Sequence, residues 1–240
     1  MGTSSSFKGK VGRVLLPDDF NLDDDKKIES HRSDWTAAKG LMSKYISSNK
    51  TIGSPKQIAR TYIKASGGSS RLIGNIGKNA TIKLGNVFES FVKNGISQTL
   101  NNIGISIKGS SLQEAMSKLV NYVQEEAVSK NDIAIRTATA NTLEKLLELN
   151  LDDDKLDSDA AIVLMQYFFS DLIWQQMLVD FGYSFEKYGN NLDELVQVEA
   201  SMQDYIKASV EEAFKQNKDN IFSKDMYDGI FKMCLEIMEA

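Results

Sequence analysis

The stretch from Ala160 to Tyr183 constrains the fold most, because its apolar residues cover nearly every direction of a helix. A helix that is apolar all round lies at the centre of a protein, with other helices packed on it. Asp171 and Asp180 are its only charged residues; each could be a buried functional acid, and we interpret both as lying at the solvent-exposed edge. Interruptions by polar residues fit a membrane span poorly. The stretch therefore predicts a central helix of a soluble protein.

Amphipathic segments on both sides of this stretch predict the helices that surround it. Their apolar residues recur at three- and four-residue spacing, and the whole chain of 240 residues has only two prolines. We expect an all-α fold, a multi-helix bundle with an extended, flexible N-terminal tail. The tail and an acidic linker would occupy residues 1–29 and the helical domain residues 30–240, with a candidate division near 105–110. The expected helices cover residues 30–47, 55–66, 69–94, 112–127, 131–149, 160–183, 191–216 and 224–238.

Capping residues predict where several helices begin and end. Ser and Asp side chains accept hydrogen bonds from free N–H groups at a helix start, and glycine favours a helix end. The predicted caps are Ser33 or Asp34 for the first helix, Ser54 with Pro55 for the second, Ser110 or Ser111 for the fourth, and Gly67-Gly68 as the end of the second.

Two segments are less regular. The helix predicted from Ser69 or Ser70 to Asn94 contains Gly74, Gly77 and Gly85, which indicate close helix packing, a break near residues 74–79, or close approach to a phosphate backbone. Residues 96–108, with a turn at Gly104, predict a short helix followed by a brief β-like piece.

The acidic segment Asp18 to Lys27 includes Asp23-Asp24-Asp25. It lacks the alternating oxygen ligands, the central glycine and the terminal glutamate of a calcium-binding loop. We interpret it as a solvated linker or as negative charge at the start of a helix.

Charge divides the chain into two unlike parts. Residues 1–108 contain 17 Lys and Arg against 8 Asp and Glu, a net charge of +9, and residues 109–240 contain 11 against 25, a net charge of −14. The basic region 55–93 could contact nucleic acid or an acidic partner, so a nucleic-acid-binding accessory protein is one alternative function. No helix-turn-helix, zinc-finger or RNP motif supports nucleic-acid binding, and we prefer the interpretation of a basic face that is solvated or docked on an acidic protein. The candidate contact residues are Arg60, Lys64, Arg71, Lys78 and Lys83.

Residues that build common catalytic and metal centres are scarce. His31 is the only histidine and Cys234 the only cysteine, so no catalytic triad has a convincing base, and a multi-histidine metal centre and an internal disulfide are excluded. Cys234 lies in an apolar helical stripe, where we expect a buried, inert thiol. We therefore predict a protein that is not an enzyme and has no metal site and no cofactor. A single cysteine and the lack of a signal or membrane segment favour the cytoplasm.

The first seventeen residues, which we call the leader, have neither helical nor strand periodicity. They combine small hydroxyl residues, three glycines, three cations (Lys8, Lys10 and Arg13) and an apolar end stopped by Pro17. Removal of Met1 would leave the α-amine of Gly2, which is unhindered and a usable nucleophile near neutral pH.

Two interpretations of the leader remain open. Gly2 and Ser6 fit the N-myristoylation pattern, with the three cations as a second membrane anchor. Alternatively, a partner enzyme binds the leader in its active site and modifies Gly2, which is the interpretation we prefer. The residues expected to contact that partner are Thr3, Ser4, Ser5, Ser6, Phe7, Leu15, Leu16 and Pro17.

Several blocks of residues resemble a known family. The opening GTSSSFKGK and LLP, SDWTAAK at residues 33–39, ARTYIKASGGSSR at 59–71 and the later FVKNGISQTLNNIGI are similar to QatB, the small helical component of bacterial Qat anti-phage operons. The similarity covers roughly the first 150 residues, and the final third offers only helical character.

The resemblance implies a defence protein that works beside an ATPase, a QueC-like enzyme and a TatD-like nuclease. QueC-like enzymes activate a deazaguanine carboxylate with ATP and transfer it to an amine. The resemblance therefore implies that Gly2 accepts a deazaguanine-type group from the QueC-like partner, and that the helical body is a scaffold for the defence complex.

Overall fold

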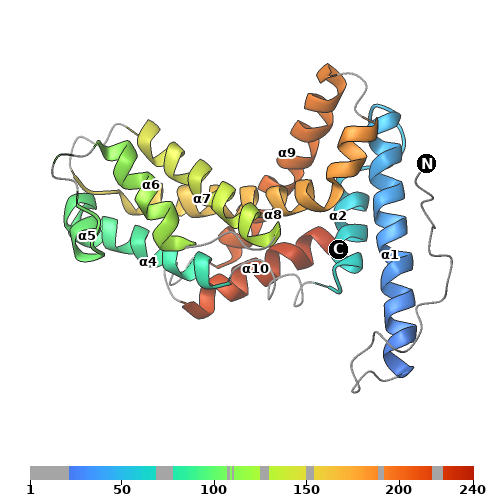
Figure 1. Cartoon of the computed structure of the whole chain (residues 1–240), viewed down its shortest axis with the longest axis horizontal. Coiled ribbons are helices and arrows are strands. Elements are labelled where there is room, and N and C mark those ends of the chain that lie inside the picture. Colours follow the sequence, from blue (N-terminus) through green and yellow to red (C-terminus); the bar gives the residue numbers. More distant parts are fainter. Residues whose placement is uncertain are drawn as a thin grey trace, which may run out of the picture.

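The described part of the chain consists of helices joined by short connections (Figure 1). The computed structural model describes residues 22–68, 78–106, 109, 111–124, 130–149, 154–188, 192–217 and 224–240. They form α1 (Leu22–Ser47), α2 (Pro55–Ala65), α4 (Lys78–Asn94), α5 (Ile96–Asn102), α6 (Leu112–Val123), α7 (Lys130–Glu148), α8 (Ser158–Tyr188), α9 (Leu192–Gln216) and α10 (Lys224–Glu239). Since these residues include no strand, the predicted all-α bundle is confirmed.

The first helix begins earlier than predicted. α1 starts at Leu22, so Ser33 and Asp34 lie inside the helix and the prediction that either residue caps it is wrong. Asp23, Asp24 and Asp25 lie in the first turn of α1. The interpretation of these acids as charge at a helix start is therefore confirmed. Residues 1–21, which include the predicted flexible tail, lie outside the described residues, and the proposed domain division stays a prediction.

α8 is the central helix, as its apolar sequence predicts. It has 31 residues and runs horizontally through the middle of Figure 1. α7 and α9 pack along it, α4 contacts it at one end of the molecule and α1 crosses it at the other. α10 packs on α9, α2 and α4. One hydrophobic core includes residues from α1 to α10, and therefore from both sides of the candidate division near 105–110.

Aromatic residues of α8 connect the surrounding helices. The ring of Phe169 lies 5.6 Å from Phe214 of α9 and 5.4 Å from Phe231 of α10, measured between centroids. Phe181 lies 5.4 Å from Tyr62 of α2. Edge-to-face and tilted contacts at these separations stabilise a core beyond the burial of apolar area. The aromatic residues thus fix the positions of α2, α9 and α10 relative to α8.

Gly85 permits a close approach between α4 and α10. A Cβ atom added at Gly85 would collide with the phenol ring of Tyr227, which is buried between the two helices. Close helix packing, one of the three roles predicted for the glycines, is confirmed at this position. Gly74 and Gly77 lie outside the described residues.

The structure confirms the predicted caps at the starts of α2 and α6 and at the end of α2. Ser54 Oγ accepts a hydrogen bond from the backbone N–H of Gln57, with Pro55 in the first turn of α2. Ser111 and Glu114 form a capping box at the start of α6. Gly67 and Gly68 follow the end of α2 with positive φ angles, and the N–H of Gly68 donates to the carbonyl of Ile63.

The segment 96–108 contains a helix but no described strand. α5 ends at Asn102, and the described residues 103–106 after it form no strand. The predicted β-like piece is therefore wrong for these residues, and residues 107 and 108 lie outside the described residues. Asp154 docks on the start of α5: its carboxylate accepts hydrogen bonds from the N–H and the hydroxyl of Ser97 at 3.0 and 2.7 Å. Of the helices described, none is both long and apolar enough to cross a membrane.

Candidate functional site

The residues predicted for modification and partner contact belong to the leader. Gly2, Thr3, Ser4, Ser5, Ser6, Phe7, Leu15, Leu16 and Pro17 all lie outside the described residues. Their roles stay predictions.

Two described cations of the region 55–93, Lys64 and Lys83, have partners on other helices. Lys64 of α2 pairs with Asp34 of α1 at 3.2 Å, and Arg60 on the same helix is exposed. Lys83 of α4 donates to the backbone carbonyl of Tyr122 on α6 at 3.3 Å, and its ammonium group lies over the Tyr122 ring. α1 and α6 are at opposite ends of the molecule, so Lys64 and Lys83 face different neighbours (Figure 1). Arg71 and the side chain of Lys78 lie outside the described residues, and contact with nucleic acid or an acidic partner stays a prediction.

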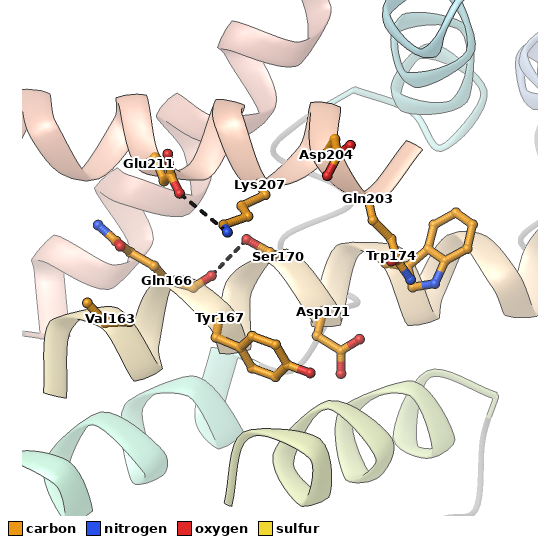
Figure 2. Close-up of a pocket in the computed structure, with 10 residues that line it drawn as sticks. All are labelled: Val163, Gln166, Tyr167, Ser170, Asp171, Trp174, Gln203, Asp204, Lys207 and Glu211. Atoms are coloured by element: carbon orange, nitrogen blue, oxygen red, sulfur yellow. Dashed lines mark hydrogen bonds and ion pairs between the residues drawn. The ribbon is translucent and has the colours of Figure 1, made fainter. Parts of the chain in front are cut away.

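A pocket of about 390 Å³ lies between α8 and α9 (Figure 2). α8 contributes residues from three successive turns of one side: Val163, Gln166, Tyr167, Ser170, Asp171 and Trp174. α9 contributes Gln203, Asp204, Lys207 and Glu211. The pocket therefore combines two aromatic rings with three carboxylates, two amides and one ammonium group.

Asp171 is the most buried acid of this pocket. Its carboxylate accepts a hydrogen bond from Asn141 Nδ2 of α7 at 2.8 Å and another from Gln175 Nε2 at 3.0 Å. Burial raises the pKa of the Asp171 carboxyl, while the two amide donors lower it by a smaller amount. Because the donors are neutral, they satisfy oxygen atoms of the carboxylate without compensating its charge.

The aromatic residues of the pocket flank Asp171 on α8. Tyr167 precedes it by one helical turn and Trp174 follows it by one turn. Burial raises the pKa of the Tyr167 phenol, and the nearby Asp171 carboxylate raises it further, so Tyr167 keeps its proton at neutral pH. Trp174 is buried and packs edge-on against Phe185 at 6.0 Å. A ligand next to Asp171 would thus meet a phenol and an indole.

The only ammonium group in the pocket is close to an acid of its own helix. Lys207 Nζ lies 4.0 Å from Glu211 Oε1, one turn further along α9, and Figure 2 shows this contact at the α9 side of the pocket. Tyr167 and Asp171 project from neighbouring turns of α8 away from Lys207 in the same view. In this view Asp171 therefore points away from Lys207, the one lysine that lines the pocket.

Asp180, the second acid of the central stretch, faces the core instead. Its Oδ2 atom accepts hydrogen bonds from the hydroxyl of Tyr62 at 2.9 Å and from Nε2 of Gln176 at 3.2 Å. Tyr62 is completely buried and Gln176 nearly so. The interpretation of Asp171 and Asp180 as residues at the solvent-exposed edge is therefore incomplete, because both are half-buried and hydrogen-bonded.

Cys234 is fully buried, as its apolar stripe predicts, and burial raises the pKa of its thiol to about 12. The side chain of His31 lies outside the described residues. Within the ranges that the structure describes, no three His, Cys, Asp or Glu residues gather closely enough to hold a metal ion.

The pocket between α8 and α9 was not predicted from the sequence. Its one available signal was the set of polar residues Gln166, Ser170 and Asp171, which share one side of an otherwise apolar helix. The residues of α9 gave no signal, because Gln203, Asp204 and Lys207 have the composition of an ordinary solvated face.

Comparison with known proteins identifies one family. The family model described as "QatB: Qat anti-phage system associated protein" matches residues 66–238. No curated protein and no solved structure matches the chain.

Proposed function

Since the chain belongs to the QatB family of proteins associated with the Qat anti-phage system, we propose that it acts in that defence as a protein substrate and scaffold. In this proposal a QueC-like partner enzyme attaches a deazaguanine-type group to the α-amine of Gly2. The helical body holds the defence complex together and performs no bond chemistry of its own. The observation that carries the proposal is the family match over residues 66–238.

The chemistry of the leader supports Gly2 as the acceptor. An α-amine has a pKa of about 7.7 to 8.0, so a useful fraction is unprotonated and nucleophilic near neutral pH. The amine nitrogen would attack the ATP-activated acyl carbon, an amide bond would form, the activating group would leave and the amine would lose a proton. Glycine has no side chain to obstruct the approach of the acyl group.

The described body supports a role as a scaffold rather than a catalyst. Its single thiol is buried inside the core, and burial raises the pKa of that thiol, which disfavours a nucleophilic thiolate. Asp180 is engaged by Tyr62 and Gln176, and Asp154 by Ser97. These acids contribute to packing and to helix ends.

The intact mass of the protein tests the proposal. We expect the full chain, expressed together with a QueC-like partner, to gain the mass of a deazaguanine-type acyl group that maps to the N-terminal peptide. Gly2→Leu should abolish the gain, because a bulky second residue retains Met1 and moves the amine. Expression without the partner is the control for modification by other enzymes.

A matched variant separates this proposal from lipidation. Ser6→Ala removes the hydroxyl that completes the myristoylation pattern and keeps Gly2. The deazaguanine-type mass should persist in Ser6→Ala. An unmodified Gly2 in the presence of the partner, a gain that maps elsewhere, or the mass of a fatty acyl chain would overturn the proposal.

A further inference from the structure

The pocket between α8 and α9 has an excess of negative charge. Asp171, Asp204 and Glu211 contribute three carboxylates, and Lys207 contributes the one cation, which lies beside Glu211. The described partners of Asp171 are the neutral amides of Asn141 and Gln175. Asp204 is exposed at the rim, and among the described residues it forms no hydrogen bond or ion pair. Two carboxylates of the pocket therefore lack a cationic partner within the described structure.

The pocket also offers apolar and aromatic surface beside the charge. Tyr167 and Trp174 lie one turn on either side of Asp171, and Val163 extends this surface along α8. Aromatic rings attract cations through their electron-rich faces, and they also pack against methylene groups. Elsewhere in this protein Lys39 and Lys187 hold their ammonium groups 5.7 and 5.6 Å from the centroids of Trp35 and Tyr183.

We propose that the pocket between α8 and α9 binds an organic cation, namely the guanidinium or ammonium group of an arginine or lysine side chain from a protein segment. Asp171 would accept hydrogen bonds from the cation, Tyr167 and Trp174 would pack on its methylene arm, and Asp204 would attract it to the rim. A volume of about 390 Å³ accommodates one such side chain with part of its backbone.

The mixed lining favours an organic cation over a metal ion. A hard metal ion requires several oxygen ligands at short range and gains nothing from aromatic walls. No group of three acidic, His or Cys residues close enough for this is present among the described residues. An arginine or lysine side chain instead uses both components of the pocket, its apolar walls and its carboxylates.

The source that we propose for the cation is the chain's own leader. The chain's own leader carries Lys8, Lys10 and Arg13 and has no acidic residue before Asp18. Binding of these cations would leave Gly2 several residues away and free to react. Binding of a basic segment from a different protein is the alternative outcome that the test distinguishes. The inference does not depend on modification of Gly2, since it concerns the chain alone.

The experiment uses the full chain with Trp35→Phe, so that Trp174 is the only tryptophan and reports on the pocket. Lys8, Lys10 and Arg13 of this chain are replaced by glutamine, so that its own leader does not compete with the added peptides. Three peptides of equal length are titrated: residues 2–17 of the leader, the same peptide with Lys8, Lys10 and Arg13 replaced by glutamine, and an unrelated peptide of alanine and three arginines. We expect both cationic peptides to change the Trp174 fluorescence saturably and the neutral peptide to have no effect.

Variants of the pocket locate the binding. Asp171→Asn should weaken binding of the cationic peptides about tenfold, because it removes a charged acceptor. Asp204→Asn, at the exposed rim, should weaken it about threefold. Glu186→Gln is the matched control: it removes a carboxylate from an exposed position of α8 outside the pocket and should leave the affinity unchanged.

The outcomes separate the two sources and can overturn the proposal. Tighter binding of the leader peptide than of the arginine peptide supports the leader as the source, whereas equal or weaker binding of the leader peptide excludes it as the specific occupant and leaves a basic segment of another protein. If the neutral peptide binds as well as the cationic peptides, or if Asp171→Asn and Asp204→Asn bind them unchanged, the proposal is wrong. Should Asp171→Asn fail to fold, Asp204→Asn decides alone.

Discussion

Asp171 and Asp180 lie on the same helix, nine positions apart, and face opposite sides of it. Nine residues correspond to two and a half turns, which places one carboxylate on the side of α7 and the pocket and the other on the side of α2. Each carboxylate accepts hydrogen bonds from two side chains. The same residue type on one helix thus occupies two different environments.

The difference lies in which groups depend on each acid. Asp180 satisfies the hydroxyl of Tyr62, which is completely buried and has no access to water. Asp171 satisfies Asn141 and Gln175, whose half-buried amides lie near an open pocket. A buried donor without a partner is costly, whereas a donor near water can be hydrated. We therefore expect Asp180 to stabilise the fold, whereas the surroundings of Asp171 are compatible with the binding role proposed for it.

The largest expected effect is that of Asp180→Ala. It leaves the Tyr62 hydroxyl and the Gln176 amide without an acceptor inside the core, at a cost of about 3 kcal/mol in the free energy of unfolding. Urea unfolding measures this cost. Adding Tyr62→Phe to Asp180→Ala should recover part of the loss, because it removes the Tyr62 hydroxyl, one of the two donors left without an acceptor. A loss below about 0.5 kcal/mol would show that water reaches this side of α8 and would break the comparison.

Two buried tyrosines sharpen the same comparison with a smaller effect. Tyr62 has a partner for its hydroxyl, whereas the hydroxyl of Tyr227 is buried without one among the described residues. We expect Tyr62→Phe to lower the free energy of unfolding by about 1 kcal/mol and Tyr227→Phe to leave it unchanged or raise it by up to about 1 kcal/mol. Thermal unfolding of the two variants side by side measures the difference. Equal losses would contradict the importance of the partner.

Local chemistry explains what could be predicted from the sequence. The caps at Ser54 and Ser111, the glycines after α2 and the central position of α8 each depend on residues close together in the chain. The start of α1 was ambiguous for the same reason, since three consecutive aspartates suit a linker and a first helical turn equally well. The structure places these aspartates at the start of α1 and not in a linker.

The pocket could not be predicted, because it depends on how α9 lies against α8. Nothing local distinguishes Asp204 from other exposed acids of α9, and Asp171 acquires its surroundings from Asn141 on α7. Asp154 shows the same limit: it lies in an acidic connection, yet it binds the start of α5, more than fifty residues earlier. Contacts between distant segments are set by tertiary packing, which residue spacing does not encode.

The smallest expected effect on stability is that of Asp171→Asn, and its sign depends on pH. Burial raises the pKa of Asp171 above its value in the unfolded chain, about 3.9. Between these two pKa values the folded state binds more protons than the unfolded state, so this residue makes the protein less stable as the pH rises through the interval. Asparagine does not titrate. The free energy of unfolding of the variant, relative to that of the wild type, should therefore increase from acidic to neutral pH. At neutral pH the variant should be as stable as the wild type or up to about 1 kcal/mol more stable.

The measurement is the difference in free energy of unfolding between Asp171→Asn and the wild type across that pH range. Taking the difference cancels the ionisable groups that do not interact with Asp171. The charged and ionisable groups around the pocket are Tyr167 on α8, Glu144, Lys145 and Glu148 on α7, and Asp204, Lys207 and Glu211 on α9. A loss above about 1 kcal/mol at neutral pH would make Asp171 a structural acid like Asp180, and the two sides of α8 would then be alike. A variant that is at least as stable as the wild type but binds the cationic peptides less tightly would show that Asp171 serves binding, because the loss of affinity could not then be attributed to a loss of folding.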